Sequence, residues 1–466
     1  MAASAPQAPG EAGFRPRVRS AMPGIEWPAV PGGTSAALLS LLWQYERSQW
    51  LAPEALERLQ FVQLGMLLAH AWATVPFYRE RLKRAGYEPG RPLTRRIWRS
   101  IPVLTRAQVQ AAGKRLHSAK LPAAHGKTTT VRSSGSTGRP IETLATGLTG
   151  AVFTAITLRD YAWHGRDLQG RLAAIRIFKG ALGAPPEGVA QRDWGGPIAQ
   201  VFETGPSYGL STAATLEEQA AWLARVDPHY LFVFPSVLRE LLLHPGARPP
   251  SLRQVTTFSE PLDPELRALC REAWGAPVID LYSAQETGYL ALQCPAREHY
   301  HVQAESVVFE TLAAGGRACE PGEIGRAVVT PLFNFAMPLI RYEVGDFVEP
   351  GPPCDCGRGL PVLRRIAGRV RNMVTLPSGE RFWPNLGTSE FAGILPVRQH
   401  QFVQKSLERL ELRLVAGRRG TPQEEARLRE LVTRSIGHPF ALEIVYVERI
   451  ERGPGGKYEE FLSELG

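Results

Sequence analysis

Residues 133–140 read Ser-Ser-Gly-Ser-Thr-Gly-Arg-Pro and follow a run of three threonines. Two glycines allow backbone turns that a Cβ would prevent, which leaves N–H groups free to face an anion. The four hydroxyl groups of the segment add further donors around the same hollow. We therefore interpret this loop as a cradle for the phosphates of a nucleotide, formed by Ser133, Ser134, Gly135, Ser136, Thr137 and Gly138.

The end of the loop distinguishes it from a Walker A motif. A Walker A loop ends in Gly-Lys-Ser/Thr, whereas this loop continues into Arg139-Pro140. The proline also prevents the loop from opening directly into a long helix. By composition alone the segment is typical of a flexible surface turn, so the phosphate-binding interpretation depends on motifs elsewhere in the chain.

Length and composition are those of a soluble globular protein with more than one domain. The chain has 466 residues, of which 44% are hydrophobic and 21% charged, and one hydrophobic core rarely serves so many residues. The net charge of +9 comes from arginines scattered along the chain, which does not indicate a dedicated nucleic-acid surface. No apolar run is long enough to span a bilayer, and five cysteines are too few for a disulfide framework. We predict a cytoplasmic protein without nucleic-acid or membrane partners.

The pattern of apolar residues predicts an α/β fold in three regions. Residues 1–33 are rich in Ala, Pro and Gly and lack the apolar core of a signal peptide, so we expect a disordered tail. Farther along, β-like runs such as 230–234 and 254–258 alternate with helical segments such as 264–274. This alternation predicts mainly parallel sheets flanked by helices over residues 34–368, with a β-rich subdomain near 306–349. Residues 369–466 are expected to form a small α+β domain.

The segment Asp280-Leu-Tyr-Ser-Ala-Gln-Glu-Thr-Gly288 lies where a predicted strand ends in a loop. Open α/β sheets bind ligands at the carboxyl ends of their parallel strands. At such a position the ring of Tyr282 can stack on a base, and the carboxylate of Glu286 can hold Mg²⁺ on a phosphate. Taken alone, Tyr282 is more typical of a packed edge residue and Glu286 of a solvated acid.

Two further glycine-containing segments carry polar candidates. In Arg341-Tyr-Glu-Val-Gly-Asp346 an acid follows a tight turn, where its carboxylate can accept from both hydroxyls of a ribose or cap its own backbone. Gly453-Pro-Gly-Gly-Lys457 holds a lysine on a glycine-rich loop. A lysine on a mobile domain can be delivered to a reacting phosphate as a positive charge, although a surface lysine is the simpler explanation of this segment alone.

The order of these segments resembles the adenylate-forming (acyl-CoA synthetase) superfamily. The shared series is the loop at 133–140, the segments 282–288 and 341–346, the Gly-Arg pair at 368–369 and the C-terminal Lys457. The chain is most similar to the phenylacetate–CoA ligase and coenzyme F390 synthetase-like branch, and the resemblance runs from about Leu41 to the end. The segments that carry this finer resemblance are Leu67-Leu-Ala-His-Ala-Trp-Ala-Thr-Val-Pro-Phe-Tyr-Arg79, Ile101-Pro-Val-Leu-Thr-Arg106 and Phe234-Pro-Ser236.

The resemblance implies that ATP activates a carboxylic acid as an acyl-adenylate, pyrophosphate leaves, and the acyl group passes to CoA. It implies an N-terminal adenylation domain at 34–368, which binds ATP and the acid, and a mobile C-terminal domain at 369–466. The loop at 133–138 would hold the phosphates of ATP, and Glu286 the magnesium ion. Lys457, Glu286 and Arg369 would be the catalytic residues. The nucleotide would further contact Ser259, Glu260, Pro261, Tyr282, Ser283 and Asp346.

One position departs from the family pattern. The family usually has an aspartate at the hinge between the two domains, whereas this chain has Asn372, preceded by Arg371. Asparagine tolerates unusual backbone angles about as well as aspartate, so we expect the hinge to work. The efficiency of the thiol-transfer step is left open by this substitution.

The cysteines provide candidate metal ligands. Cys354-Asp-Cys356 is a thiolate pair in a Pro/Gly-rich loop, and Cys294 is followed by His299 and His301. Two thiolates from one loop with a Cys and a His from another suit tetrahedral Zn²⁺, although Cys-x-Cys is a less common spacing than Cys-x₂-Cys. Relatives of the F390 synthetase-like type contain similar sets, and the resemblance favours His301 over His299. We predict a structural zinc site of Cys294, His301, Cys354 and Cys356 with no position open for catalysis.

The acid and the final acceptor stay open. Apolar residues at 231–234, with Tyr289, Trp163 and His164, can line a pocket for an aryl or arylacetic acid or can belong to the core. The acceptor can be CoA, a carrier-protein phosphopantetheine or an amine. The presence of both Lys457 and Glu286 argues against a non-catalytic nucleotide-binding scaffold. A zinc-containing nucleic-acid binder would need a basic stripe with interleaved aromatic residues, which the chain lacks. No segment marks an oligomer interface.

Overall fold

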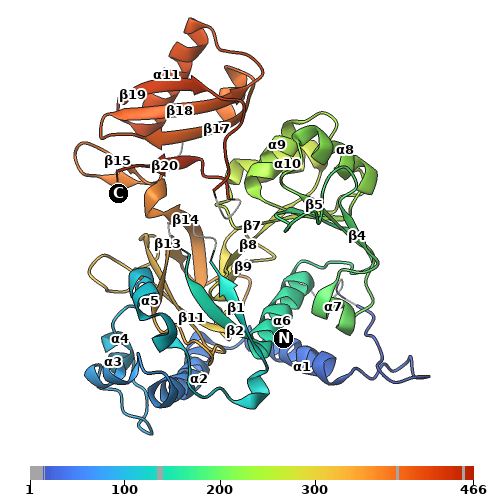
Figure 1. Cartoon of the computed structure of the whole chain (residues 1–466), viewed down its shortest axis with the longest axis vertical. Coiled ribbons are helices and arrows are strands. Elements are labelled where there is room, and N and C mark those ends of the chain that lie inside the picture. The colour runs from blue at the N-terminus through green and yellow to red at the C-terminus, as the bar shows by residue number, and fades with distance from the viewer. Residues whose placement is uncertain (1–13, 15, 134–139, 385–387, 454–456, 466) are drawn as a thin grey trace, which may run out of the picture.

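One long sheet runs through the larger part of the molecule (Figure 1). The computed structural model describes Phe14 and residues 16–133, 140–384, 388–453 and 457–465. The twelve strands of the sheet that lie among these residues are β3 (Leu172–Arg176), β4 (Val189–Gln191), β5 (Ser207–Ser211), β6 (Tyr230–Val233), β7 (Gln254–Phe258), β8 (Val278–Ala284), β9 (Gly288–Gln293), β10 (Tyr300–Val302), β11 (Val307–Leu312), β12 (Gly325–Pro331), β13 (Tyr342–Gly351) and β14 (Val362–Arg369). Their order in the sheet is β11-β12-β13-β14-β10-β9-β8-β7-β6-β3-β5-β4.

The neighbouring strands β5, β3, β6, β7 and β8 are parallel, and β4 pairs antiparallel at the edge. Parallel neighbours need crossover connections, which helices commonly supply. Here α8 (Leu216–Val226), α9 (Pro235–Leu243) and α10 (Pro264–Trp274) supply three of them and share one buried core with β3, β6 and β7. The predicted alternation of strands and helices is confirmed, and β7 and α10 have the predicted bounds.

The other half of the sheet is antiparallel. Strand β8 pairs with β7 on one side and, through an antiparallel hairpin, with β9 on the other. From β9 the sheet continues through β10, β14, β13, β12 and β11. The β-rich subdomain predicted from the sequence is therefore continuous with the parallel strands rather than a separate layer, and the mixed α/β class is confirmed.

Helices from the first part of the chain pack against the opposite side of the sheet from α8, α9 and α10 (Figure 1). They contribute to one large core together with side chains of β9, β11, β12 and β13. The helices are α1 (Gly33–Ser48), α2 (Pro53–Thr74), α3 (Arg79–Arg84), α4 (Arg95–Ser100), α5 (Arg106–Ala112), α6 (Gly147–Trp163) and α7 (Gly196–Val201).

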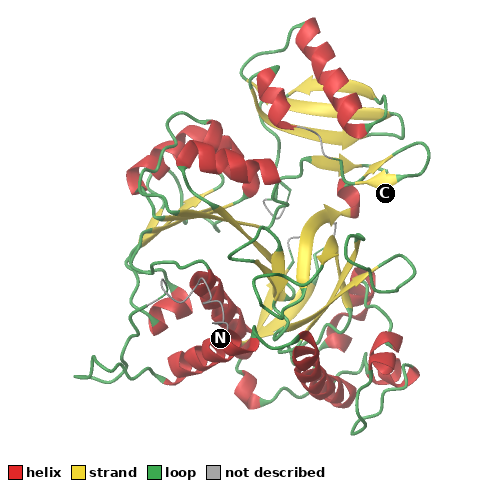
Figure 2. Ribbon diagram, turned by 180° about the vertical axis from the view of Figure 1, so that it is seen from behind, coloured by secondary structure: helices red, strands yellow, loops and turns green. Residues whose placement is uncertain are grey.

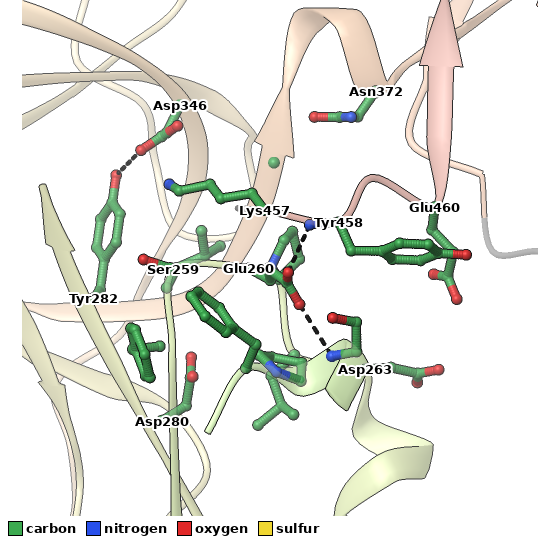
Figure 3. Close-up of a pocket in the computed structure, with 18 of the residues that line it drawn as sticks. Ser259, Glu260, Asp263, Asp280, Tyr282, Asp346, Asn372, Lys457, Tyr458 and Glu460 are labelled. Carbon is green, nitrogen blue, oxygen red and sulfur yellow. Dashed lines mark hydrogen bonds between the residues drawn. The ribbon is translucent and has the colours of Figure 1, made fainter. Parts of the chain in front are cut away.

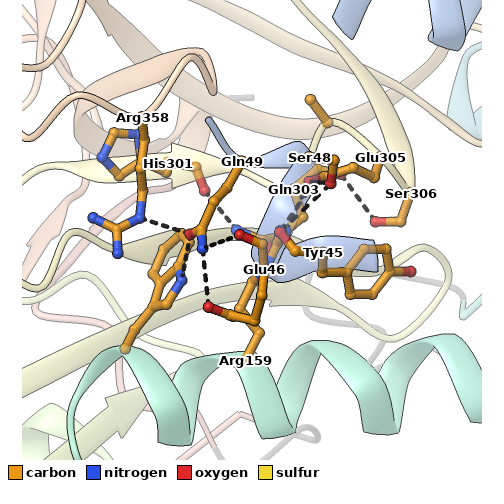
Figure 4. Close-up of polar contacts among 12 residues, drawn as sticks. Tyr45, Glu46, Ser48, Gln49, Arg159, His301, Gln303, Glu305, Ser306 and Arg358 are labelled. Carbon is orange, nitrogen blue, oxygen red and sulfur yellow. Dashed lines mark hydrogen bonds and ion pairs between the residues drawn. The ribbon is translucent and has the colours of Figure 1, made fainter. Parts of the chain in front are cut away.

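A buried arginine joins α1 and α6 to the sheet (Figure 4). The side chain of Arg159 in α6 is fully buried, and a charge removed from water needs close partners. Its guanidinium donates to Glu305 Oε1 at 2.7 Å, to Gln303 Oε1 at 2.9 Å and to the carbonyl oxygen of Tyr45 in α1. Glu305 also accepts from the Ser48 hydroxyl at 2.6 Å. These contacts fix both helices to the connection between β10 and β11.

The tail predicted to be disordered makes defined contacts from residue 14 onward. Arg19 N–H donates to the carbonyl oxygen of Val201 at 2.8 Å, and Val18 forms a β-bridge with Phe202. The ring of Phe14 packs edge-on against that of Phe202, with centroids 6.3 Å apart. The described part of this segment thus packs beside the end of α7, and the disordered tail stays a prediction.

The C-terminal residues form a second sheet with its own core (Figure 2). Its order is β19-β18-β17-β20, and α11 (Pro422–Ile436) covers it between a Thr421 cap and Gly437. The domain boundary at residue 369 stays a prediction. Among the described helices, none combines the length and apolar character needed to cross a membrane. The strands of this part are β15 (Val374–Thr375), β16 (Arg381–Phe382), β17 (Val397–Gln404), β18 (Arg409–Ala416), β19 (Ala441–Tyr446) and β20 (Phe461–Ser463).

Candidate functional site

A cavity of about 1040 Å³ lies between the carboxyl ends of the parallel strands and the C-terminal part. The loops after β6, β7 and β8 line one side, and residues 398–400 and 457–461 line the other. This edge of an open α/β sheet is where such folds bind ligands. The lining includes the predicted residues Ser133, Ser259, Glu260, Pro261, Tyr282, Ser283, Glu286, Asp346, Arg369 and Lys457.

The base of the predicted phosphate loop is a two-stranded hairpin of β1 (Thr128–Arg132) and β2 (Glu142–Thr146). Ser133 follows β1 directly, and its backbone N–H donates to the carbonyl oxygen of Ile141 at 2.9 Å. Its hydroxyl accepts from the Ile141 N–H at 3.0 Å and from Arg106 at 2.9 Å. The rest of the predicted loop lies outside the described residues, and its role stays a prediction; it comprises Ser134, Gly135, Ser136, Thr137 and Gly138.

Asp346 connects the two halves of the sheet at the cavity wall. It accepts from the Tyr282 hydroxyl at 3.0 Å, and its other oxygen accepts from Arg369 Nε at 2.8 Å (Figure 3). Cross-strand pairing of β13 with β14 sets Asp346 opposite Arg369. Burial, followed by the negative charge of Asp346, raises the pKa of Tyr282 well above its ordinary value, so the phenol stays protonated and donates. A carboxylate offers about four acceptor sites, so Asp346 retains capacity for a ligand hydroxyl.

The carboxylate of Glu286 faces an arginine that the sequence did not single out. Arg106 Nη1 lies 3.6 Å from Glu286 Oε1, and the same guanidinium donates to Ser133. Arg106 is the first residue of α5, so the helix start brings it to the phosphate-loop base. In the sequence, Arg106 is notable only as the last residue of the segment Ile101-Pro-Val-Leu-Thr-Arg106. That segment supports the family resemblance but does not indicate a catalytic or binding role.

Lys457 extends from the C-terminal part toward the wall formed by Tyr282 and Asp346 (Figure 3). Burial, followed by the positive charge of Arg369, lowers the pKa of its ammonium group, while Asp346 and Glu286 act in the opposite direction. A bound anion at this point would favour the charged form of the lysine. Sequence positions more than a hundred residues apart thus supply one cluster of opposite charges.

The loop after β7 touches the C-terminal part directly. Ser259 has a φ of 71°, a left-handed conformation that is strained for a residue with a side chain. The next residue, Glu260, accepts from the N–H groups of Ser236 at 3.0 Å and Tyr458 at 2.7 Å, and from Arg452 Nη1 at 3.2 Å. The carboxylate of Glu260 is thus engaged by protein donors, and Ser259, Glu260 and Pro261 all line the cavity.

Asp280 supports the cavity floor. It accepts from the Thr257 hydroxyl at 2.6 Å and the Tyr300 hydroxyl at 2.7 Å. Burial raises its pKa to about 6, against which these two donors act. Both carboxylate oxygens have protein partners, so Asp280 holds β8 against β7 and β10.

Asn372 lies where β14 leads into the C-terminal part. Its side-chain oxygen accepts from the Arg369 N–H at 3.3 Å, and its side-chain nitrogen donates to the carbonyl oxygen of Phe461 at 2.7 Å. The neighbouring Arg371 forms an ion pair with Glu459. The amide therefore uses both a donor and an acceptor, and an ionised aspartate at the same position could supply only the acceptor.

Thiol and imidazole groups converge at the connection between β9 and β10. One ligand atom from each of Cys294, His299, His301 and Cys354 lies within 4.8 Å of the others. Cys356 Sγ is 3.3 Å from His301 Nε2, and Cys294 Sγ is 3.9 Å from Cys354 Sγ. Three of the predicted ligands thus lie together with His299, whereas Cys356 is placed beside His301 but outside this set of four. Thiolate and imidazole donors in this number form the set that Zn²⁺ prefers.

The aromatic residues suggested for an acid pocket are divided by the structure. Phe234 lines the cavity, and Phe258 beside it stacks on Phe232 with ring centroids 4.2 Å apart. Tyr289 stacks at 4.4 Å on Phe153 of α6, whose ring is 45% exposed. In contrast, Trp163 is buried and donates to Gln49, away from the cavity lining.

A curated protein is similar to this chain over most of its length. Phenylacetate-coenzyme A ligase from Thermus thermophilus is 25% identical over 421 residues, which cover 86% of this chain and 87% of that protein. No model of a known protein family matches the chain.

Solved structures share the fold. 2-Hydroxyisobutyryl-CoA ligase in the postadenylation state, in complex with R3-HIB-AMP, gives a TM-score of 0.70 at 19% identity and covers 90% of this chain and 92% of its own. The same ligase in complex with 2-HIB-AMP and CoA in the thioesterification state gives 0.56 at 20% identity, covering 90% and 91%.

Proposed function

We propose that the chain is an adenylate-forming ligase, which activates a carboxylic acid with ATP and transfers the acyl group to coenzyme A; its similarity to phenylacetate-coenzyme A ligase over most of its length supports this. In the first step a carboxylate oxygen attacks the α-phosphorus of ATP, and the bond to the bridging oxygen breaks as pyrophosphate leaves. In the second step the sulfur of CoA attacks the acyl carbonyl, the thiol loses its proton, and AMP leaves. The enzyme is an AMP-forming acid–thiol ligase.

The observation that carries the proposal is the cluster of Lys457, Asp346, Arg369, Tyr282 and Glu286 around one cavity. Negative charge shifts between oxygens on phosphorus during adenylation, and fixed positive groups in a water-poor site stabilise it. Lys457 and Arg369 would supply these charges. Asp346 would accept from the ribose hydroxyls, and the ring of Tyr282 would pack against the adenine.

Magnesium belongs to this proposal at Glu286. Mg²⁺ prefers oxygen ligands and is bound in such sites by one or two carboxylates together with phosphate oxygens. The Glu286 carboxylate lines the cavity beside Arg106 and Ser133 at the base of the phosphate loop. Mg²⁺ there would neutralise charge on the leaving pyrophosphate when bound.

We also propose a structural zinc ion held by Cys294, His301 and Cys354, with the fourth ligand from Cys356, as the sequence predicts, or from His299. The convergence of these groups supports it. Purified protein should contain about one zinc per chain by elemental mass spectrometry, and Cys354→Ser should lose it. Cys319→Ser, outside the cluster, should retain it, and comparing Cys356→Ser with His299→Ala would identify the fourth ligand. Wild-type protein without zinc would contradict the site.

The acid is proposed to be of the aryl or arylacetic type. Phe234 and Phe258 lie side by side in the cavity lining with ring centroids 4.6 Å apart, and such paired aromatic side chains suit a flat ring.

Carboxylate-dependent exchange of labelled pyrophosphate into ATP tests the first step. A panel of aryl, arylacetic and short aliphatic acids should give exchange with one class, and Lys457→Ala should lower it by about 10²- to 10³-fold, as for other charge-stabilising groups. Lys405→Ala is the matched control, because Lys405 pairs with Glu464 on the same part of the chain outside the cavity lining. Loss of the adenylate on adding CoA, rather than a carrier protein or an amine, would establish the acceptor. Exchange unaffected by Lys457→Ala would contradict the proposed chemistry.

A further inference from the structure

The loop that carries Lys457 is closed on itself at its base. Gly453 N–H donates to the carbonyl oxygen of Lys457 at 3.0 Å. Arg452 and Tyr458, which flank this hydrogen bond, both reach Glu260 on the other side of the cavity. One carboxylate of the N-terminal part thus holds both ends of the loop (Figure 3 shows the Tyr458 contact).

Arg452, in the C-terminal part, contacts several residues of the N-terminal part. Its Nη1 donates to the Ser236 hydroxyl at 2.8 Å and to Glu260 Oε1 at 3.2 Å, and its Nη2 lies 3.8 Å from Glu240 Oε1. The guanidinium also lies 6.0 Å from the ring centroid of Phe234, within the range of a cation–π contact. All of these partners belong to α9 or to the residues beside β6 and β7, whereas Arg452 belongs to the C-terminal part.

The charges in this contact are largely removed from water. The side chains of Arg452 and Glu240 are each 18% exposed, and that of Glu260 is 4% exposed. Burial raises the pKa of both glutamates, and the charge of Arg452 acts against this rise. Two buried or partly buried carboxylates therefore share one guanidinium, and removing this cation would leave them with neutral hydrogen-bond donors and the more distant charge of Arg398.

We propose that Arg452 is a positioning residue for adenylation: its anchorage to Glu260, Ser236 and Glu240 holds the Lys457 loop in the cavity, and it is released for thiol transfer. The inference rests on the proposed function for its chemical consequence. Any movement that withdraws Lys457 must first separate Arg452 from Glu260. The anchorage therefore favours the first half-reaction and is not needed for the second.

Measuring the two half-reactions separately distinguishes a positioning role of Arg452 from a general effect on protein stability. Arg452→Ala should lower pyrophosphate exchange by tenfold or more, while thioester formation from chemically prepared acyl-adenylate and CoA should stay at the wild-type rate or rise. Arg452→Lys keeps the charge but lacks the second nitrogen that faces Glu240, so exchange should fall to an intermediate level. Arg449→Ala is the matched control, because Arg449 lies on the same segment, is 79% exposed and pairs only locally with Glu451 among the described residues. Equal losses in both half-reactions, or no loss in exchange, would overturn the proposal.

Amide hydrogen exchange gives a readout that does not require turnover. The Tyr458 N–H is bonded to Glu260, so peptides that contain Tyr458 should exchange several-fold faster in Arg452→Ala than in wild type, and Arg449→Ala should leave them unchanged. Unaltered protection of Tyr458 in folded Arg452→Ala would contradict the anchorage even if no acid supports turnover. Absence of pyrophosphate exchange in the wild type with every acid would instead contradict the proposed function, with the anchorage judged by hydrogen exchange alone.

Discussion

At the scale of single residues, Asp346 balances Arg369 and accepts from Tyr282 in a partly buried position. Asp346→Asn removes the charge and turns one acceptor into a donor. We expect the KM for ATP in pyrophosphate exchange to rise about ten- to a hundredfold, because hydrogen bonds to charged groups contribute about 1.5–3 kcal/mol. Initial rates over a range of ATP concentrations measure the effect.

Tyr282→Phe provides the comparison, since it keeps the ring and loses only the hydroxyl. A hydrogen bond of this kind contributes about 0.5–1.5 kcal/mol, which corresponds to a change in KM of about two- to tenfold. If Asp346→Asn leaves the KM for ATP as low as in the wild type, the proposed ribose contact is wrong.

The raised pKa of Asp280 leads us to expect that the stability of the protein depends on pH. Its pKa in the folded protein is about 6, compared with the ordinary value of 3.8. Between these values the folded state holds a proton that the unfolded state has lost, so the free energy of unfolding falls as pH rises from about 4 to about 6. The total loss is on the order of 3 kcal/mol at about 1.36 kcal/mol per pH unit.

Asp280→Asn cannot ionise and should lack this loss. We expect the melting temperature of the variant, relative to wild type, to rise by a few degrees between pH 4 and pH 7, as measured by thermal unfolding at a series of pH values. Parallel pH profiles for the two proteins would show that Asp280 does not titrate in this range.

At the scale of elements, the end of α1 fits closely against the loop that carries Cys354 and Cys356. Gly359 N–H donates to the carbonyl oxygen of Gln49 at 2.9 Å, and a Cβ at Gly359 would overlap the carbonyl oxygen of Leu51. Gly359→Ala should therefore destabilise the protein by about 1–3 kcal/mol or more, since backbone atoms cannot turn aside as a side chain can. Chemical denaturation measures the loss.

Gly315→Ala is the control for this substitution. A Cβ at Gly315 would meet nothing within 4 Å among the described residues, so its effect should stay within about 0.5 kcal/mol. Equal stability of the two variants would mean that α1 and the loop can separate without cost.

The sequence predicted individual elements better than the contacts between them. The bounds of β7 and α10 follow from alternating and helical periodicity, which are local properties. Arg106 and Arg452 were not predicted, because each becomes part of the site only through long-range packing that no local pattern records. The contacts of residues 14–33 were missed for the same reason. Tyr282 and Asp346 were identified only because the segments that contain them occur in the order that the resemblance requires.

At the scale of the whole molecule, Asn372 connects the two parts by accepting from Arg369 and donating to Phe461. Asn372→Asp loses the donor and places a negative charge beside a carbonyl oxygen. We expect the observed arrangement to weaken, so that the burst of acyl-adenylate formed before steady state slows by about two- to tenfold. Rapid-quench measurement of acyl-AMP tests this, and an unchanged burst would show that the Phe461 contact does not hold the parts together.

The position of the C-terminal sheet also explains why the sequence could identify the site residues but not predict which of them lie close together. Lys457 and Asp346 meet only when the second sheet lies over the cavity, and the position of that sheet depends on contacts such as Gln399 with Glu240.

Because Arg452 and Tyr458 are both attached to Glu260, the length of the chain between them is fixed at both ends. With both ends fixed to one point, the reach of Lys457 is set by how many residues separate the anchors. Inserting one glycine between Arg452 and Gly453 would leave every anchoring side chain in place and still change the length of chain that joins the anchors. In this loop the length of the chain is as much a functional property as the identity of its residues.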